Sequence, residues 1–253
     1  MSVRETVLKS LSAVGAQHEA KFYADLFARQ DAETFAMIVL DPRCLKEPLL
    51  EAVISALRIL SNLELSPTLV VGAMEDARTS VKAQAQRLSK ELGKSGVRTN
   101  KLNTASYGLI KEVRKIARSG NIPILEMTDR RGKMNLAGLT KALQPQKIIF
   151  LQPSGGLNEN GVRRANLTIA DLPEFMENET FSAGQIRFLD SVLVLEKSAK
   201  ARRSYVIASP LNLLGELFTT NGSGTLIRRG IDFQKGRAFK DFETSKLLSL
   251  IHI

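Results

Sequence analysis

The chain has 253 residues, of which 43% are hydrophobic and 25% are charged, and this composition is typical of a globular protein rather than a disordered or fibrous one. The 36 lysines and arginines outnumber the 26 aspartates and glutamates, which gives a net charge of +10. One cysteine excludes an intrachain disulfide framework, and with only two histidines we expect no metal site. No run approaches the roughly 18 apolar residues of a membrane span, so we expect no membrane partner.

The positive charge raises the question of a nucleic-acid partner. The basic residues are scattered in short clusters, and none is interleaved with the aromatic side chains on which single-stranded nucleic acids stack. We therefore interpret the charge as solvated faces and sites for small anions, and we keep a basic nucleic-acid-binding module only as a remote alternative.

Apolar residues recur at helical spacing within residues 3–14 and again up to Phe27. The run 35–40 is continuously apolar and predicts a strand buried on both faces. The same two patterns then alternate along the chain. They predict helices over 47–63, 78–92, 106–118, 135–143 and 184–197, and strands over 67–71, 122–127, 147–151 and 205–208.

Ser209-Pro210 resembles a helix N-cap followed by proline in the first turn, and we expect that helix to run through Leu217. Segments 152–173 and 219–224 are rich in turn-forming residues and predict loops or hairpins. The alternation predicts an α/β protein, a three-layer αβα sandwich with a mainly parallel sheet. We divide the chain into an N-terminal helical segment (1–30), one domain (31–240) and a tail (241–253).

Three segments carry a family resemblance. Residues 216–230 (ELFTTNGSGTLIRRG) and 150–157 (FLQPSGGL) resemble the amino-acid kinase domain shared by arginine-sensitive N-acetylglutamate kinases and N-acetylglutamate synthases. Residues 19–27 (EAKFYADLF) are similar to the N-terminal helix of the arginine-regulated members. The order of β-α units fits as well, so the resemblance covers nearly the whole chain and implies the amino-acid kinase fold.

The kinase chemistry of that family is poorly matched here. Active members carry a lysine and paired glycines after the first strand, and Val39, Asp41 and Pro42 stand at these positions. Proline has no N–H for a phosphate, and the aspartate adds negative charge. The strand 148–151 ends in Gln152 instead of Ser-Asp, no aspartate follows Met134-Asn135, and no lysine stands near Arg187-Phe188. We therefore expect no catalytic residue in this chain.

The resemblance also implies a site for the feedback inhibitor arginine. Glu216 matches the carboxylate that would bind the guanidinium, Gly222 and Gly224 match the loop that approaches the ligand, and Tyr23 matches an aromatic position on the N-terminal helix. Other readings stay open, since Glu216 could be a solvated helix acid and the glycines could simply shape a hairpin. Tyr23 could be a core residue or a subunit contact.

The resulting hypothesis is a regulatory and oligomerising domain of an N-acetylglutamate synthase, the first enzyme of arginine biosynthesis. Its partners would be L-arginine, an acetyltransferase domain of the same polypeptide, and further copies in a dimer, tetramer or hexamer. Acetyl-CoA is expected only for that acetyltransferase domain, and ATP with magnesium only for the alternative, an active acetylglutamate kinase in which Lys133 or Lys147 contacts phosphate. We expect a bacterial cytoplasmic location, with the mitochondrial matrix as the alternative.

Overall fold

The computed structural model describes residues 34–74, 80–129, 131–159, 161–178, 181–199, 203–218 and 222–230. The N-terminal helices predicted from the sequence, including Tyr23, and the tail 241–253 lie outside the described residues. Within the described ranges, no helix has both the length and the apolarity to cross a membrane.

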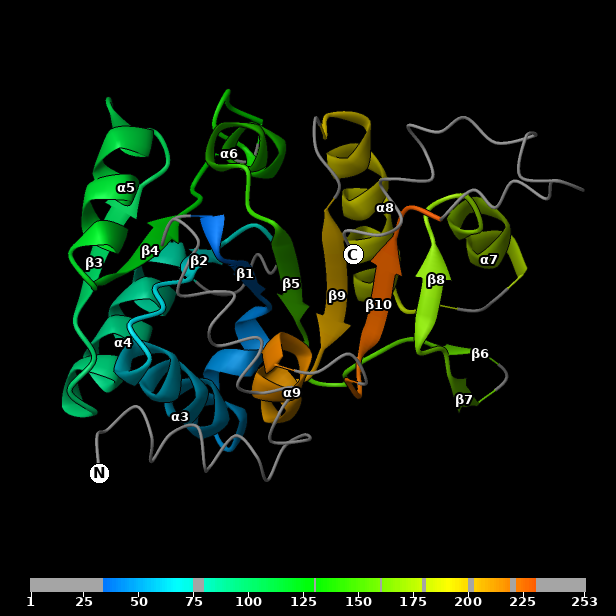
Figure 1. The fold of residues 1–253 in the computed structure, drawn as a ribbon, viewed down its shortest axis with the longest axis horizontal. Helices are drawn as coiled ribbons and strands as arrows, with labels where there is room; N and C mark the ends of the chain where they lie inside the picture. Colours follow the sequence, from blue (N-terminus) through cyan, green and yellow to red (C-terminus); the bar gives the residue numbers. More distant parts are fainter. Residues whose placement is uncertain are drawn as a thin grey trace, which may run out of the picture.

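Eight strands form one sheet in the order β3-β4-β2-β1-β5-β9-β10-β8 (Figure 1). The first six strands of this order are parallel, whereas β10 runs antiparallel to β9 and parallel to β8. The strands are β1 (Met37–Leu40), β2 (Thr68–Val71), β3 (Thr99–Asn103), β4 (Ile122–Glu126), β5 (Lys147–Leu151), β8 (Asn166–Thr168), β9 (Ser204–Ala208) and β10 (Thr225–Arg228). A separate hairpin joins β6 (Asn158–Glu159) to β7 (Val162–Arg163).

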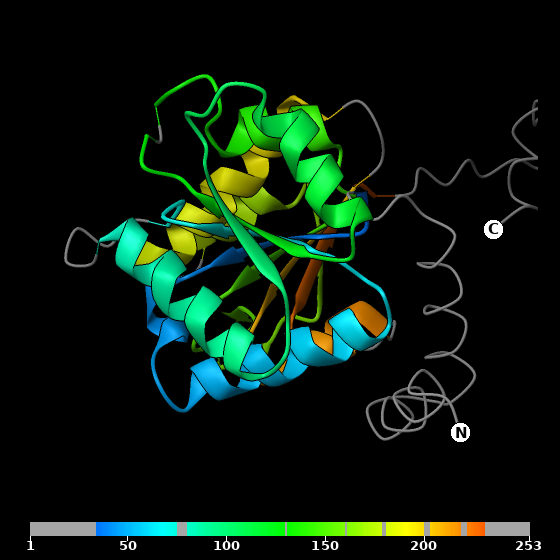
Figure 2. The same ribbon diagram turned by 90° about the vertical axis from the view of Figure 1, so that its left-hand side faces the viewer.

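Helices cover both faces of the sheet (Figure 2). One face packs against α3 (Leu49–Asn62), α4 (Val81–Lys94) and α9 (Leu213–Phe218). The other face packs against α5 (Leu109–Arg118), α6 (Leu136–Leu143), α7 (Leu172–Asn178) and α8 (Ala183–Lys197). This arrangement confirms the predicted three-layer αβα sandwich with a mainly parallel sheet.

The central strand β1 shows why its sequence is apolar throughout. Successive side chains of a strand point to opposite faces, so Ile38 and Leu40 enter the α3–α4–α9 core while Met37 and Val39 enter the other core. All four side chains are buried. A strand covered on both sides has no position for a polar side chain, and this produces the continuous apolar run.

Several elements were not predicted from the sequence. The edge strand β3 reads Thr-Asn-Lys-Leu-Asn and lies partly exposed, so it lacks the apolar run that identified the central strands. β8 falls inside the segment 152–173, interpreted as loops or hairpins, whereas β10 and most of α7 lie in stretches for which no element was predicted. The helix expected directly after Ser209 begins instead with the 3-10 turn η3 (Pro210–Asn212), in which the Ser209 hydroxyl accepts from the Leu211 N–H, and α9 follows at Leu213.

The antiparallel strand β10 determines which residues meet at one corner of the sheet. After β9 ends at Ala208, the chain passes through η3 and α9 and returns to pair Thr225 of β10 with Ile207 of β9. The residues just before β10 therefore lie beside the carboxyl end of β9 and close to α9. This topology brings together Glu216 and the glycine-containing loop 222–224.

Candidate functional site

The α9–β10 corner, which we define as Glu216, loop 222–224 and Lys147, unites three of the residues predicted to bind arginine. The Glu216 Oε1 atom accepts a hydrogen bond from the Gly224 N–H at 2.6 Å. Glu216 is only 5% exposed, so it is a buried carboxylate and not a solvated helix acid. The fourth predicted residue, Tyr23, lies outside the described residues and stays a prediction.

Both glycines of the corner are required by close approach. A Cβ atom at Gly222 would lie 2.1 Å from Glu216 Oε2, and a Cβ atom at Gly224 would lie 2.4 Å from the backbone oxygen of Ile207. These distances are far below van der Waals contact. The carboxylate thus packs directly on the backbone of the loop, and the two glycines make that contact possible.

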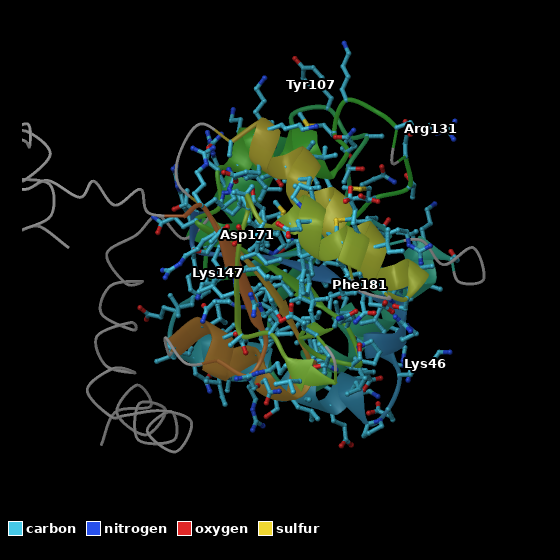
Figure 3. The ribbon with its side chains drawn as sticks, turned by 90° about the vertical axis from the view of Figure 1, so that its right-hand side faces the viewer. Lys46, Tyr107, Arg131, Lys147, Asp171 and Phe181 are labelled. Carbon is cyan, nitrogen blue, oxygen red and sulfur yellow. The ribbon has the colours of Figure 1, made fainter. Side chains whose placement is uncertain are left out.

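Lys147 is a member of the corner that sequence reasoning did not assign to it. Its ammonium donates a hydrogen bond to the backbone oxygen of Glu216 at 2.6 Å, from a position 69 residues earlier in the chain. Figure 3 shows Lys147 on the side of the molecule that carries α9 and β10. Burial lowers the pKa of Lys147, and the nearby Glu216 carboxylate opposes that change.

The charge state of Glu216 is set by opposing effects. Burial raises its pKa above the ordinary value of 4.5. The Gly224 N–H, the Lys147 ammonium, the Ser223 N–H and the Arg163 guanidinium each favour the ionised form and lower the pKa. The corner therefore holds a desolvated carboxylate whose remaining lone pairs can accept from a cationic ligand.

The carboxyl end of β1, where the family resemblance expects phosphate-binding groups, is filled by an ion pair within the chain. Asp41 Oδ1 accepts from the Arg43 N–H and Nε, both at 2.9 Å, and Oδ2 accepts from Nη2 at 2.7 Å. Asp41 also caps the 3-10 helix η2 (Pro42–Leu45), in which Pro42 is the first residue. Val39 is completely buried in the core.

This geometry does not fit a bound phosphate. The carboxylate already supplies the negative charge at the carboxyl end of β1, and Arg43 binds both of its oxygens. Pro42 contributes no N–H donor. The neighbouring thiol of Cys44 is also unreactive in character, because burial and then the Asp41 charge raise its pKa to about 12.

Gln152 closes the adjoining end of β5. Its backbone N–H donates to the Ala208 oxygen at 2.9 Å, and its side-chain Nε2 donates to the Gly155 oxygen at 2.5 Å. Gly155 has a φ of +75°, a conformation that glycine adopts without strain. The side chain thus shapes the loop after β5, and the residue is only 1% exposed.

A separate cleft of about 340 Å³ opens between α6, α8 and the carboxyl ends of β2 and β4. Active kinases of the family would carry a catalytic lysine near Arg187-Phe188. Here Arg187 lines the cleft, whereas Phe188 lies in the core. Asn135 also lines it and uses its side chain to cap α6 through the Gly138 N–H at 3.0 Å. In the described part of the chain, no three His, Cys, Asp or Glu residues are grouped to hold a metal ion.

No protein-family model matches the chain. It is 25% identical to the mitochondrial protein arg-6 of Neurospora crassa, in an alignment that covers all of this chain and 36% of that protein. It is 32% identical to human mitochondrial N-acetylglutamate synthase over 58% of this chain and 31% of the synthase. It is 25% identical to the acetylglutamate kinase of Xanthomonas campestris, over 92% of this chain and 68% of the kinase.

Among solved structures, N-acetylglutamate synthase from Neisseria gonorrhoeae in complex with coenzyme A and N-acetyl-glutamate superposes with a TM-score of 0.64 at 20% identity. That match covers 92% of this chain and 68% of the synthase. The same synthase in complex with coenzyme A and L-arginine also gives a TM-score of 0.64, at 17% identity, over 82% of this chain and 64% of the synthase.

The fold is that of the amino-acid kinases. More specifically, the chain is homologous to the amino-acid kinase domain of N-acetylglutamate synthase and to acetylglutamate kinase. It spans about a third of the length of the fungal and human relatives.

Proposed function

We propose that this chain is the regulatory, oligomerising amino-acid kinase-like domain of an N-acetylglutamate synthase, that it binds L-arginine, and that it has no kinase activity. The parent enzyme would make N-acetylglutamate from glutamate and acetyl-CoA, with acetyl-CoA bound by an acetyltransferase domain. The similarity to human mitochondrial N-acetylglutamate synthase, of whose length this chain spans 31%, supports this assignment.

The observation that carries the proposal is the buried contact between Glu216 and the Gly224 N–H. A buried carboxylate is costly unless it has cationic or hydrogen-bonding partners, and a free arginine supplies both through its guanidinium. Glu216 would accept from the guanidinium, while the glycine backbone allows the ligand to approach closely. The N. gonorrhoeae synthase has been solved with L-arginine, which supports a ligand of this chemistry.

Calorimetric titration of the chain with L-arginine tests the proposal. We expect saturable heat with arginine and none with L-citrulline, which has the same length but lacks the positive charge that a carboxylate recognises. No heat and no thermal shift with millimolar arginine would reject the arginine site. Equal heats for the two ligands would reject Glu216 as the recognising group.

An active acetylglutamate kinase remains the second candidate, because the alignment with the X. campestris kinase covers 92% of this chain. Lys133 is exposed, whereas the Lys147 ammonium donates to the Glu216 carbonyl, so Lys133 is the better placed of the two for a phosphate contact. A coupled ADP assay with MgATP and N-acetylglutamate separates the two functions. Sustained turnover that depends on acetylglutamate would establish the kinase and reject our proposal.

The oligomerising role has its own test. We expect sedimentation of the full chain to give a dimer, tetramer or hexamer. A monomer at all accessible concentrations would remove this part of the proposal without affecting the arginine site.

A further inference from the structure

The guanidinium of an arginine of this chain, Arg163, lies at the α9–β10 corner. Arg163 is on β7 of the β6–β7 hairpin, where it pairs with Asn158. Its Nη1 atom donates a hydrogen bond to the backbone oxygen of Gly222 at 3.1 Å. The contact joins a hairpin and a loop that are 59 residues apart, so neither local sequence pattern could reveal it.

The Arg163 guanidinium and the Glu216 carboxylate both lie against Gly222. The carbonyl that Arg163 binds belongs to Gly222, and a Cβ atom on that residue would lie 2.1 Å from Glu216 Oε2. Lys147 and Arg163 are the cationic side chains that act on Glu216, from β5 and from β7. A carbonyl, a carboxylate and a guanidinium are thus grouped at this corner.

We propose that Arg163 is a tethered competitor of the amino-acid ligand, whose guanidinium occupies the Gly222 carbonyl until free arginine displaces it. This inference rests on the arginine site of the proposed function. Two guanidinium groups cannot share these few acceptors without like-charge repulsion, so ligand binding requires Arg163 to leave. Ligand binding then breaks the contact between Arg163 and Gly222, and so frees the β6–β7 hairpin from loop 222–224.

The competition should be modest. Arg163 is exposed and makes one hydrogen bond at the corner, so its charge is screened by solvent. Its advantage is the tether, which gives the intramolecular group a high effective concentration. We expect removal of the guanidinium to tighten arginine binding by about threefold to tenfold, since a single exposed contact is being lost.

The adjacent residue provides a matched control. Arg164 lies on the same hairpin but pairs with Glu159, with 2.9 Å between Nη1 and Oε2. Replacing Arg164 removes the same charge from the hairpin and leaves the contact with Gly222. A general effect of net charge would change both variants alike, whereas tethered competition changes only the Arg163 variant.

The test is calorimetric titration with L-arginine of the wild type, Arg163→Met, Arg163→Lys and Arg164→Met, each first shown to unfold at a similar temperature. We expect tighter arginine binding in Arg163→Met. The gain in affinity should be smaller in Arg163→Lys, which keeps the positive charge but not the planar guanidinium, and Arg164→Met should bind as the wild type does. In nitrogen-15 spectra of the wild type, the Arg163 Nε–H signal should shift with the same midpoint as the heat.

The outcomes separate the two claims. If the wild type binds arginine but Arg163→Met binds equally or more weakly, Arg163 orders the loop and the competitor is rejected while the arginine site stands. If none of the four proteins binds arginine, the proposed function fails and the competitor falls with it. Binding by Arg163→Met alone would support both.

Discussion

The carboxyl end of β1 and the α9–β10 corner each contain a buried carboxylate, but they satisfy it in different ways. Asp41 is bound on both oxygens by Arg43, two residues away on the same turn. Glu216 is bound by a backbone N–H from a loop eight residues away, beside a lysine from another strand. The first carboxylate is bound by a side chain of its own turn, while the second is bound by backbone N–H groups of loop 222–224.

In our proposal, the first carboxylate stands where a phosphate site is missing and the second belongs to the arginine site. A local ion pair closes the position of a phosphate and needs nothing from the rest of the fold. The carboxylate at the glycine loop instead depends on contacts between α9, β5 and the loop before β10. The predictions that follow test the contrast between these two carboxylates.

Replacing Gly224 should have the largest effect. A Cβ atom there would lie 2.4 Å from a backbone oxygen of β9, which cannot move without disturbing the sheet. We expect Gly224→Ala to lower the free energy of unfolding by about 2–3 kcal/mol. At Gly222 the obstructing atoms are the movable end of Glu216, so Gly222→Ala should cost only about 1 kcal/mol while abolishing arginine binding.

Chemical denaturation measures both glycine variants. Equal losses of stability would show that the loop tolerates a side chain at Gly224 by shifting as a whole, and would contradict the close packing at this corner.

Removing the charge of Glu216 should weaken ligand binding strongly. Glu216→Gln keeps an acceptor for the Gly224 N–H but loses the charge-assisted bond to a guanidinium. Such bonds contribute about 1.5–3 kcal/mol, which corresponds to roughly a tenfold to hundredfold rise in Kd. Asp41→Asn serves as the matched control at the other carboxylate, and it should leave arginine binding unchanged.

Acid should weaken arginine binding in the wild type. The pKa of Glu216 is raised above 4.5, so the carboxylate is lost on acidification earlier than in a free glutamate, while the guanidinium stays charged. Because the pKa of Glu216 is higher in the folded state, the folded state binds the proton more tightly than the unfolded state does. The protonated side chain therefore contributes most to stability below pH 4.5, and this contribution is lost as the pH rises through the raised pKa. Affinity that is flat across this window would contradict the role of Glu216.

Breaking the Asp41–Arg43 pair should have a smaller effect on stability. Asp41→Ala removes the cap of η2 and leaves the Arg43 N–H without its acceptor, at a cost of about 1 kcal/mol. Arg43 is 58% exposed, so the ion pair itself adds little. Thermal unfolding gives the cost, and a gain of ATP turnover in this variant would contradict our view that several phosphate-binding groups are missing together.

Cys44 should remain unmodified in the folded protein. Its thiolate is the reactive form, and a pKa of about 12 leaves almost none of it at pH 8. We expect no alkylation by iodoacetamide over an hour and full alkylation in denaturant, as measured by mass spectrometry. Rapid modification of folded protein would show that the β1 end opens to solvent.

The sequence predicted the central sheet because burial on both faces leaves a continuous apolar run, as in residues 35–40 and 147–151. It did not predict β3, whose edge position permits Asn100 and Lys101, and it missed β10, which directly follows the turn-rich segment 219–224. Glu216, Gly222 and Gly224 were identified together because residues 216–230 resemble a segment of the amino-acid kinase domain.

Lys147 and Arg163 could not be assigned to the corner from the sequence, because their contacts bridge 69 and 59 residues. The Asp41–Arg43 pair is local, yet the sequence showed only the negative charge of Asp41. Whether a neighbouring arginine folds back on that carboxylate depends on the turn of η2, which the residue types alone do not fix.

The most direct measurement follows the carboxyl carbon of Glu216 by carbon-13 NMR while L-arginine is added at neutral pH. We predict a saturable change in its chemical shift that is absent with L-citrulline, because only the charged guanidinium is recognised by this carboxylate. Saturable arginine binding with an unmoved Glu216 signal would contradict the account, since the ligand would then lie elsewhere.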